Sequence, residues 1–360
     1  MKPYKIIISG GGTGGHLYPA LAIAETLRAR NPRAEILFVG ALGRMEMQKV
    51  PQAGYPIIGL WIDGLQRSLT IRNLFFPIKL IWSLLKSIGI LLKFKPDVVV
   101  GTGGFASGPI LFMARWFSIP TLIQEQNSYP GITNKLLSKT VNTIAVAYGG
   151  MEKFFPPKKI VQTGNPIRKS IITGHSNPEQ AKAYFRLNLS QPTLVVLGGS
   201  LGARRINQLV EAKLQYFNKK GLQLIWQCGS LYYDQYQKHQ SDSVMVFPFI
   251  AEMDLLYAAA NVVISRSGAA TLSELCCVAK PVLLIPSPNV AENHQYHNAN
   301  ALAQKKAAML VEEKNLDRDF ENIFDQILND NKQQQLSQNL KKMAQPNATA
   351  HIVDHIEAFL

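Results

Sequence analysis

The sequence predicts an α/β protein with two doubly wound domains, each with a parallel sheet covered by helices on both faces. Short runs of Val, Ile and Leu alternate with longer stretches of helical periodicity, which is typical of buried parallel strands joined by helices. These runs form two sets along 360 residues, a length that suits two domains of ordinary size. A strand, a glycine-rich turn and a helix are expected at residues 6–27 and again at 194–210.

The expected strands are short and are separated by glycine turns or helical sequence. They span residues 5–9, 36–39, 98–100, 121–124 and 143–146 in the first domain, and 193–197, 222–227, 244–248, 262–265 and 281–285 in the second. The turn at Gly164-Asn165-Pro166 follows the last strand of the first set and marks the expected boundary. We therefore expect an N-terminal domain over 1–164 and a C-terminal domain over 165–345. A final helix within 346–360 could pack back across the domains.

Positive charge is concentrated in the N-terminal half of the chain. The formal net charge is +14, and residues 1–165 carry 19 Lys and Arg against 7 Asp and Glu, whereas the remainder carries 19 against 17. The basic half is therefore expected to meet an anionic partner. Nucleic acid, an anionic membrane surface and a phosphorylated lipid are the candidates, and no nucleic-acid-binding motif is present to support the first.

Cysteine usage favours a reducing, cytoplasmic compartment. Cys228, Cys276 and Cys277 are the only cysteines, and an odd number with one adjacent pair fits neither a disulfide framework nor a zinc site. An apolar strand is expected almost from Met1, so we expect no signal peptide.

Residues 74–96 form a strongly apolar stretch that suggests a membrane surface. A proline and several lysines interrupt it, and because a charge at mid-span costs about 3 kcal/mol, a transmembrane helix is not expected. Lys79, Lys86 and Lys93 recur every seven residues on one helix face, while Trp82 and aliphatic residues occupy the rest. The pattern indicates a helix with its apolar side in lipid and its lysines on phosphates, or a helix packed on its own sheet.

The first glycine loop matches a dinucleotide-binding fingerprint only in part. Gly10, Gly12 and Gly15 have the required spacing, but an acidic residue should end the second strand to bind the ribose. That strand ends at Val39-Gly40-Ala41, and Glu35 stands at its beginning. The sequence therefore disfavours NAD. The helix N-terminus after the loop can instead meet another anion or a polarised oxygen.

His16 follows this loop directly and is the first candidate for catalysis. Imidazole titrates near neutrality, so the side chain could remove a hydroxyl proton at physiological pH. It could also simply cap the turn, and the residue alone leaves both interpretations open.

Seven motifs follow one another along nearly the whole chain. They are GGGTGGHLYPALAIA at 10–24, GTGGFASGP at 101–109, QEQNSYPGITNKLL at 124–137, TGNPIR at 163–168, GGSLGARRIN at 198–207, ISRSGAATLSE at 264–274 and ENHQYHNA at 292–299. Each motif alone is weak, but the ordered set closely resembles the MurG family of bacterial peptidoglycan glycosyltransferases. The resemblance implies the glycosyltransferase B fold, in which the two Rossmann-like domains face each other across a cleft.

For function, the resemblance implies an inverting transfer of N-acetylglucosamine (GlcNAc). The donor would be UDP-GlcNAc, and the acceptor the C4 hydroxyl of MurNAc in lipid I, undecaprenyl-pyrophosphoryl-MurNAc-pentapeptide. The product would be lipid II. The resemblance also implies peripheral attachment to the cytoplasmic face of the inner membrane, and cell-wall synthesis proteins as possible partners.

No cofactor and no metal are expected. Backbone N–H groups and a helix N-terminus can stabilise a departing diphosphate without a cation. The sequence Asp317-Arg318-Asp319 follows no strand, and we expect it on a solvated surface. His294 and His297 lack a third ligand at suitable spacing for zinc.

The resemblance assigns the acceptor to the first domain. His16 is the expected general base, with a positioning role as the alternative. The residues expected around the acceptor are Thr13, Gly14, Gly15, Gly103, Gly104, Ser107, Glu125 and Asn127, of which Thr13, Gly14, Gly15 and Asn127 are also expected near the donor. Glu125 could orient His16 or accept structural hydrogen bonds, and the sequence does not separate these roles.

The resemblance assigns UDP-GlcNAc to the second domain. The expected donor residues are Arg168, Ser200, Phe249, Ile250, Ser267, Gly268, Ala269, Ala270, Glu274, His294, Gln295 and Asn298. Glu274, a two-oxygen acceptor, would hold the ribose hydroxyls, and the turn at Phe249 would frame the uracil. The family often has two glutamines at the sugar contact, and His294 departs from that pattern at the first of them.

Other functions are less consistent with this set of motifs. An enzyme of the same fold could use another lipid acceptor such as a diacylglycerol, or epimerise a UDP-sugar. An NAD-dependent oxidoreductase is weakened by the missing acid after the second strand. A membrane-binding module without enzymatic activity would not need the UDP-binding motifs.

Overall fold

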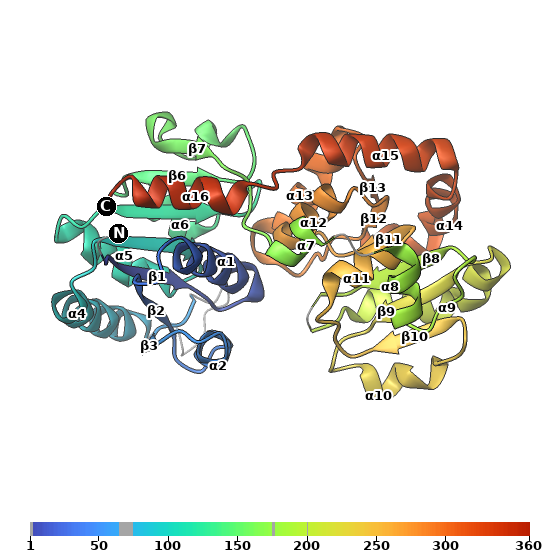
Figure 1. Cartoon of the computed structure of the whole chain (residues 1–360), viewed down its shortest axis with the longest axis horizontal. Coiled ribbons are helices and arrows are strands. Elements are labelled where there is room, and N and C mark those ends of the chain that lie inside the picture. Colours follow the sequence, from blue (N-terminus) through green and yellow to red (C-terminus); the bar gives the residue numbers. More distant parts are fainter. Residues whose placement is uncertain (1–2, 65–74, 175–176, 200) are drawn as a thin grey trace. The chain divides into compact units, whose positions relative to one another are not determined.

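The computed structural model describes residues 3–64, 75–174, 177–199 and 201–360, and it divides into two compact units (Figure 1). One unit comprises Met1–Ile167 and Gln345–Leu360, and the other comprises Arg168–Ala344. Each contains a parallel sheet between layers of helices. The expectation of two doubly wound α/β domains is therefore confirmed.

The first unit is built on a seven-stranded sheet in the order β3-β2-β1-β4-β5-β6-β7. Its strands are β1 (Lys5–Gly10), β2 (Glu35–Ala41), β3 (Ile57–Leu60), β4 (Val98–Gly103), β5 (Thr121–Glu125), β6 (Thr143–Val146) and β7 (Ile160–Gln162). Its helices are α1 (Gly14–Arg30), α2 (Glu46–Gln52), α4 (Phe76–Phe94), α5 (Ser107–Trp116), α6 (Ile132–Leu137) and α16 (Ala348–Glu357), with 3-10 turns at Met151–Lys153 and Pro157–Lys159.

Successive side chains of β1 point to opposite faces of the sheet and enter two separate cores. Ile6 and Ile8 of β1 pack with α1 and α16, whereas Ile7 packs with α4 and α5 on the opposite face. The last helix, α16, therefore completes the first unit, and Arg30 of α1 holds its carboxylates Asp354 and Glu357 at 2.7 Å each.

The second unit has a six-stranded sheet in the order β10-β9-β8-β11-β12-β13. Its strands are β8 (Thr193–Leu197), β9 (Gln223–Gln227), β10 (Val244–Phe247), β11 (Val262–Ser265), β12 (Val282–Leu284) and β13 (Met309–Leu310). Its helices are α7 (Lys169–Thr173), α8 (Pro178–Tyr184), α9 (Arg204–Lys219), α10 (Tyr233–Tyr236), α11 (Met253–Ala259), α12 (Ala269–Val278), α13 (His294–Gln304), α14 (Leu316–Ile327) and α15 (Asp330–Met343), with 3-10 turns at Gln237–His239, Ala291–Asn293 and Glu313–Asn315. An aromatic cluster of Phe217, Phe320 and Phe324 joins α9 to α14.

The two strand orders fix where each unit can bind a ligand. In each sheet the order reverses beside the first strand of its set, between β1 and β4 and between β8 and β11. Loops that leave the carboxyl ends of such neighbouring strands run to opposite faces of the sheet and open a crevice between them. The glycine motifs at 10–15, 101–108 and 198–203 and the motif at 264–270 all lie at these two switch points.

Three strands were missed by the sequence analysis, and all three lie at sheet edges. β3, β7 and β13 are four, three and two residues long, and so carry little apolar signal. Across the described part of the chain, no helix is both long and apolar enough to span a membrane.

Candidate functional site

His16 lies in the first turn of α1, at the switch point of the first sheet, and its ring has a defined orientation. Its Nδ1 atom is 3.0 Å from the Thr102 carbonyl oxygen and 3.1 Å from Oε1 of Gln126. A carbonyl oxygen can only accept a hydrogen bond, so Nδ1 carries the proton in the neutral ring and Nε2 carries the lone pair. This tautomer is the one that a general base acting through Nε2 requires.

The loop after β4 closes against the loop that carries His16. The Thr102 hydroxyl donates to the His16 carbonyl at 2.8 Å. A Cβ at Gly103 would lie 2.7 Å from His16 Nδ1, and one at Gly104 would lie 2.3 Å from the Gly11 carbonyl oxygen. Both glycines also have positive φ, of 99° and 81°. The two glycine loops therefore form one interlocked surface that admits no larger residue at these positions.

The remaining acceptor candidates have differing exposure. Thr13 and Gly15 are exposed at the start of α1, whereas Ser107 is buried and its hydroxyl donates to the Gly104 carbonyl. Ser107 thus shapes the third glycine loop in this structure.

Glu125 does not contact His16 directly. Its Oε1 accepts from the backbone and side-chain N–H groups of Asn127 at 3.0 and 3.1 Å, and its Oε2 accepts from Asn134 at 2.8 Å and from the Gly131 N–H at 3.2 Å. Of the two roles left open by the sequence, the geometry matches the structural one. The neighbour that does reach His16 is Gln126, which stands inside the QEQN motif but was not singled out.

In the second unit, a cavity of about 500 Å³ opens at the carboxyl ends of the strands. Its lining residues include Gly198 after β8, Arg266 after β11, Ser287 after β12 and Gln295 on α13. The Gln295 side-chain oxygen accepts from the Ser287 N–H at 2.9 Å. Arg266 was also missed by the sequence analysis, and it brings a guanidinium held by Glu313 and the Ile285 carbonyl to this cavity.

The motif around α12 is tied to α13 by hydrogen bonds. The Ser267 hydroxyl is buried and donates to the Gln295 carbonyl at 2.7 Å, and Asn298 Nδ2 lies 3.4 Å from the Ser267 carbonyl. α12 begins at Ala269 after Gly268, and no side chain caps it. The N–H groups of its first turn, including that of Ala270, therefore keep their partial positive charge for an anion.

Glu274 is held on α12 by two neighbours. The Tyr257 hydroxyl donates to Oε2 at 3.0 Å, and Arg168 Nε lies 3.6 Å from Oε1. Burial raises the pKa of the Glu274 carboxyl, against the opposing effects of Arg168 and of the Tyr257 hydrogen bond. Glu274 as a whole is buried, with 5% of the residue exposed. Tyr257 lies in the middle of an apolar helix, so the sequence did not indicate a role for it at the site.

The other donor candidates are partly described. Phe249 is exposed and Ile250 is buried, with the Ile250 N–H donating to Gln227 Oε1 at 2.9 Å. His294 is half-buried at the start of α13. Ser200 lies outside the described residues.

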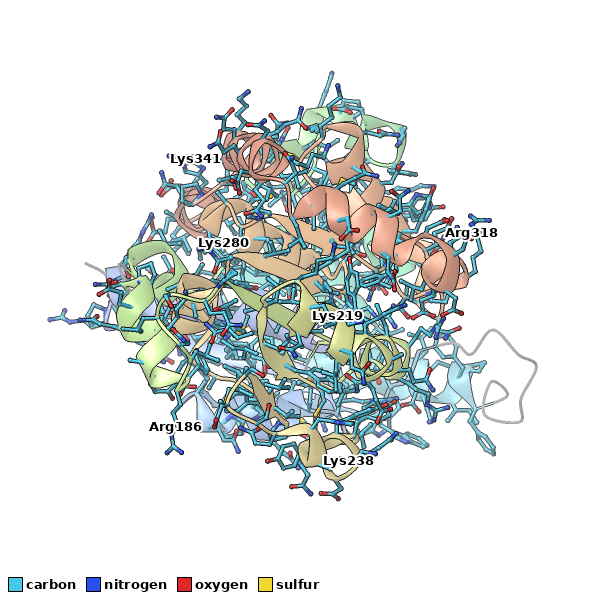
Figure 2. All side chains as sticks on the ribbon, turned by 90° about the vertical axis from the view of Figure 1, so that its right-hand side faces the viewer. Arg186, Lys219, Lys238, Lys280, Arg318 and Lys341 are labelled. Carbon is cyan, nitrogen blue, oxygen red and sulfur yellow. The ribbon has the colours of Figure 1, made fainter. Side chains whose placement is uncertain are left out.

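The Asp317-Arg318-Asp319 stretch lies on the surface of α14, where Arg318 is on the outside of the helix (Figure 2). Asp317 pairs with Arg205 at 2.7 Å, and Asp319 pairs with its neighbour Arg318 at 2.6 Å. These carboxylates are thus engaged in surface ion pairs, as expected for a solvated stretch.

The apolar helix predicted at 74–96 forms as α4, but its lysines do not share an exposed face. Lys79 binds Asp63, and Lys86 donates to the Gly59 carbonyl at 2.8 Å, so both amino groups turn toward the end of β3. Lys93 is exposed. The outward face of α4 is apolar, and it adjoins exposed apolar side chains of α5, against which α4 packs. We call this set the apolar face; it comprises Ile78, Ile81, Trp82, Leu85, Leu92, Phe112, Trp116 and Phe117.

Comparison with known proteins defines the class of this fold. Residues 6–146 match the N-terminal domain of glycosyltransferase family 28, and residues 193–357 match its C-terminal domain. The crystal structure of Acinetobacter baumannii MurG is 28% identical and superposes with a TM-score of 0.78, over 99% of this chain and 100% of that one. The fold is therefore that of the glycosyltransferase B enzymes, as expected from the sequence.

Two curated relatives are more similar in sequence. A UDP-N-acetylglucosamine--N-acetylmuramyl-(pentapeptide) pyrophosphoryl-undecaprenol N-acetylglucosamine transferase of Flavobacterium psychrophilum is 56% identical over 358 residues, which cover 99% of this chain and 98% of the relative. A protein of the same name from Christiangramia forsetii is 54% identical over 357 residues, with the same coverage. The chain belongs to this family of N-acetylglucosamine transferases, the MurG family.

Proposed function

We propose that this chain transfers GlcNAc from UDP-GlcNAc to the C4 hydroxyl of MurNAc in lipid I and so makes lipid II. The observation that carries the proposal is the 56% identity to a relative of that name across both units. The environment of His16, a histidine set for base catalysis between two glycine loops, supports it.

His16 acts as the general base in this proposal. Its Nδ1–H stays on the Thr102 carbonyl, and its Nε2 accepts the proton of the attacking C4 hydroxyl. The oxygen then attacks the anomeric carbon of GlcNAc as the bond to UDP breaks, and the configuration inverts. The positive charge that develops on the ring is stabilised by its two oxygen neighbours, the Thr102 carbonyl and the Gln126 side chain.

The second unit holds the donor. The departing diphosphate gains negative charge, which the uncapped N–H groups at the start of α12 can stabilise without a cation. Glu274, held by Tyr257 and Arg168, accepts from the ribose hydroxyls in this proposal. Gln295 lines the cavity of this unit, and in this proposal its side-chain amide contacts the sugar.

The apolar face of the first unit binds the surface of an anionic membrane, where a polyprenyl acceptor resides. It exposes eight large apolar side chains on or next to two helices that pack together, more than an ordinary solvated surface carries. Lys93, Lys95 and Arg115 are exposed on the same elements and can meet lipid phosphates. In this proposal the protein attaches peripherally to the cytoplasmic face of the inner membrane, where cell-wall synthesis proteins would be its neighbours.

The test is transfer of labelled GlcNAc from UDP-GlcNAc to a lipid I analogue in the presence of excess EDTA. We expect product from the wild type, a turnover loss in His16→Ala and a higher KM for the donor in Glu274→Ala. His351→Ala, an exposed histidine on α16, is the matched control and should retain full turnover. Loss of product with EDTA would contradict the cation-free donor site. UDP-GlcNAc binding without transfer would point to a different acceptor, such as a diacylglycerol.

A further inference from the structure

Glu46 is a buried carboxylate beside the catalytic loop, and the sequence analysis gave it no role. It begins α2, just beyond the carboxyl end of β2, and its side chain is fully buried. We propose that Glu46 is a positioning residue of the transfer reaction, which holds the first glycine loop in the shape that keeps His16 on the Thr102 carbonyl. This inference rests on the transferase activity proposed above.

The carboxylate is hydrogen-bonded to the backbone on both sides. The Gly12 N–H lies 3.1 Å from Oε1 and 3.0 Å from Oε2, and the Ala41 N–H lies 3.1 Å from Oε1. Hydrogen bonds from N–H groups to a carboxylate are stronger than neutral ones. Glu46 therefore ties the loop after β1 to the end of β2.

Two glycines leave the space that this carboxylate fills. A Cβ at Gly11 would lie 2.2 Å from Oε1 of Glu46, and one at Gly40 would lie 2.6 Å from its Cγ. These glycines are thus explained by the close approach of a side chain of the same protein. The Gly12 N–H, which a dinucleotide phosphate would need, is already bonded to a carboxylate, and this agrees with the weak case for NAD.

The loop that Glu46 holds leads directly into the first turn of α1. Gly12 precedes Thr13, the residue before α1, and His16 lies in that first turn. On the other side the loop is confined by Gly104, where a Cβ would lie 2.3 Å from the Gly11 carbonyl oxygen. A loop released on the Glu46 side could shift His16 away from Thr102, and a misplacement of about 1 Å can lower a rate on the order of 100-fold.

The test compares kcat and KM for UDP-GlcNAc in the wild type, Glu46→Gln and Glu46→Asp. Glutamine retains the volume but places a donor amide against an N–H, and aspartate retains the charge but is one methylene too short. We expect kcat to fall about tenfold or more in both. KM for UDP-GlcNAc should stay within about twofold, because Glu274 and Gln295, which hold the donor in the proposed function, belong to the other unit.

Asp97→Asn is the matched control, because Asp97 Oδ2 accepts from the Lys5 N–H at 2.7 Å at the opposite end of β1. It should leave kcat unchanged. A second readout is the ring ¹⁵N spectrum of the histidine-labelled chain, with His16 assigned by His16→Ala. In the wild type we expect a protonated Nδ1, and in the Glu46 variants a shift toward mixed tautomers.

Folded Glu46 variants with wild-type kcat and an unchanged His16 spectrum would overturn the inference. So would failure of both variants to fold when Asp97→Asn folds, because Glu46 would then be needed for folding itself. An inactive wild type would contradict the proposed function instead, and the nitrogen spectra would still report whether Glu46 holds His16.

Discussion

The Nδ1 atom of His16 and the carbonyl oxygen of Thr102 lie 3.0 Å apart, although His16 follows the glycine loop after β1 and Thr102 precedes the glycine loop after β4. The contact exists because β1 and β4 are neighbours at the point where the strand order reverses, so that both loops start at the same sheet edge. It fixes the neutral ring with its lone pair on Nε2. Substitution of His16 can show whether Nε2 acts as the base or whether the ring only positions the substrate.

His16→Asn and His16→Gln distinguish these two roles. The asparagine amide nitrogen stands near the position of Nδ1, so it can still donate to Thr102 but offers no base. If His16 is the base, both variants should lose about 100-fold or more in kcat, with little change in KM for UDP-GlcNAc. The measurement is steady-state transfer to the lipid I analogue. Turnover of His16→Asn within about tenfold of wild type would favour a positioning role.

Tyr257→Phe tests the hold on Glu274. The substitution removes the hydroxyl that donates to Oε2 at 3.0 Å, and the carboxylate loses an orienting contact of about 1 kcal/mol. We therefore expect KM for UDP-GlcNAc to rise about fivefold with kcat nearly unchanged. A donor that lacks the ribose 2′-hydroxyl should show a smaller effect, because part of the contact under test is then absent.

Tyr216→Phe is the control for that experiment. Tyr216 also donates to a carboxylate, Asp325 at 2.5 Å, but on the outer helices of the second unit. Its donor KM should match that of the wild type. Equal KM values for Tyr257→Phe and wild type would show that the hydrogen bond to Glu274 does not contribute to ribose binding.

The raised pKa of Glu274 predicts a pH-dependent cost to stability. Because burial raises the folded-state pKa above the ordinary value of 4.5, the native state binds the proton more readily than the unfolded state. Stability therefore falls as pH rises from that value through the raised pKa, and the full cost remains above it. Glu274→Gln should remove the cost and raise Tm at neutral pH by about 2 °C.

The measurement is thermal unfolding of both proteins across pH 4 to 8. The gain of Glu274→Gln should be absent at the acidic end, where the wild-type carboxyl is protonated, and it should be accompanied by weaker UDP-GlcNAc binding. A Tm difference that is independent of pH would show that the carboxyl charge has no part in it.

Much of this architecture was predictable because it depends on local sequence patterns. The central strands are continuous apolar runs, and the glycine loops stand directly after them, so the fold class and the positions of these loops followed from the sequence. The edge strands β7 and β13 were not predictable, because short edge strands need little apolar sequence. Gln126 was passed over within a motif, since its contact with His16 joins segments 110 residues apart.

The lysines of α4 show a different limit. Their seven-residue spacing predicts that they share one side of the helix, but spacing cannot tell whether an amino group on that side faces outward. Asp63 and the Gly59 carbonyl, which bind Lys79 and Lys86, lie elsewhere in the sequence. The role of Glu46 could not be predicted for a related reason. Its hydrogen-bond partners are backbone N–H groups, which almost every residue type has, so the sequence does not identify them.

The apolar face gives the last prediction, which separates membrane binding from charge alone. Ile81 and Leu85 of this face are 58% and 63% exposed, so Ile81→Ser with Leu85→Ser removes apolar area without disturbing the core. Sedimentation with anionic vesicles should show binding reduced about tenfold or more. Leu201→Ser with Leu231→Ser changes two leucines of the other unit that are 69% and 74% exposed, and this variant should bind as wild type. High salt could abolish wild-type binding while the Ile81 and Leu85 variant binds normally at low salt. In that case the positive charge alone attaches the protein, and the apolar face has another partner.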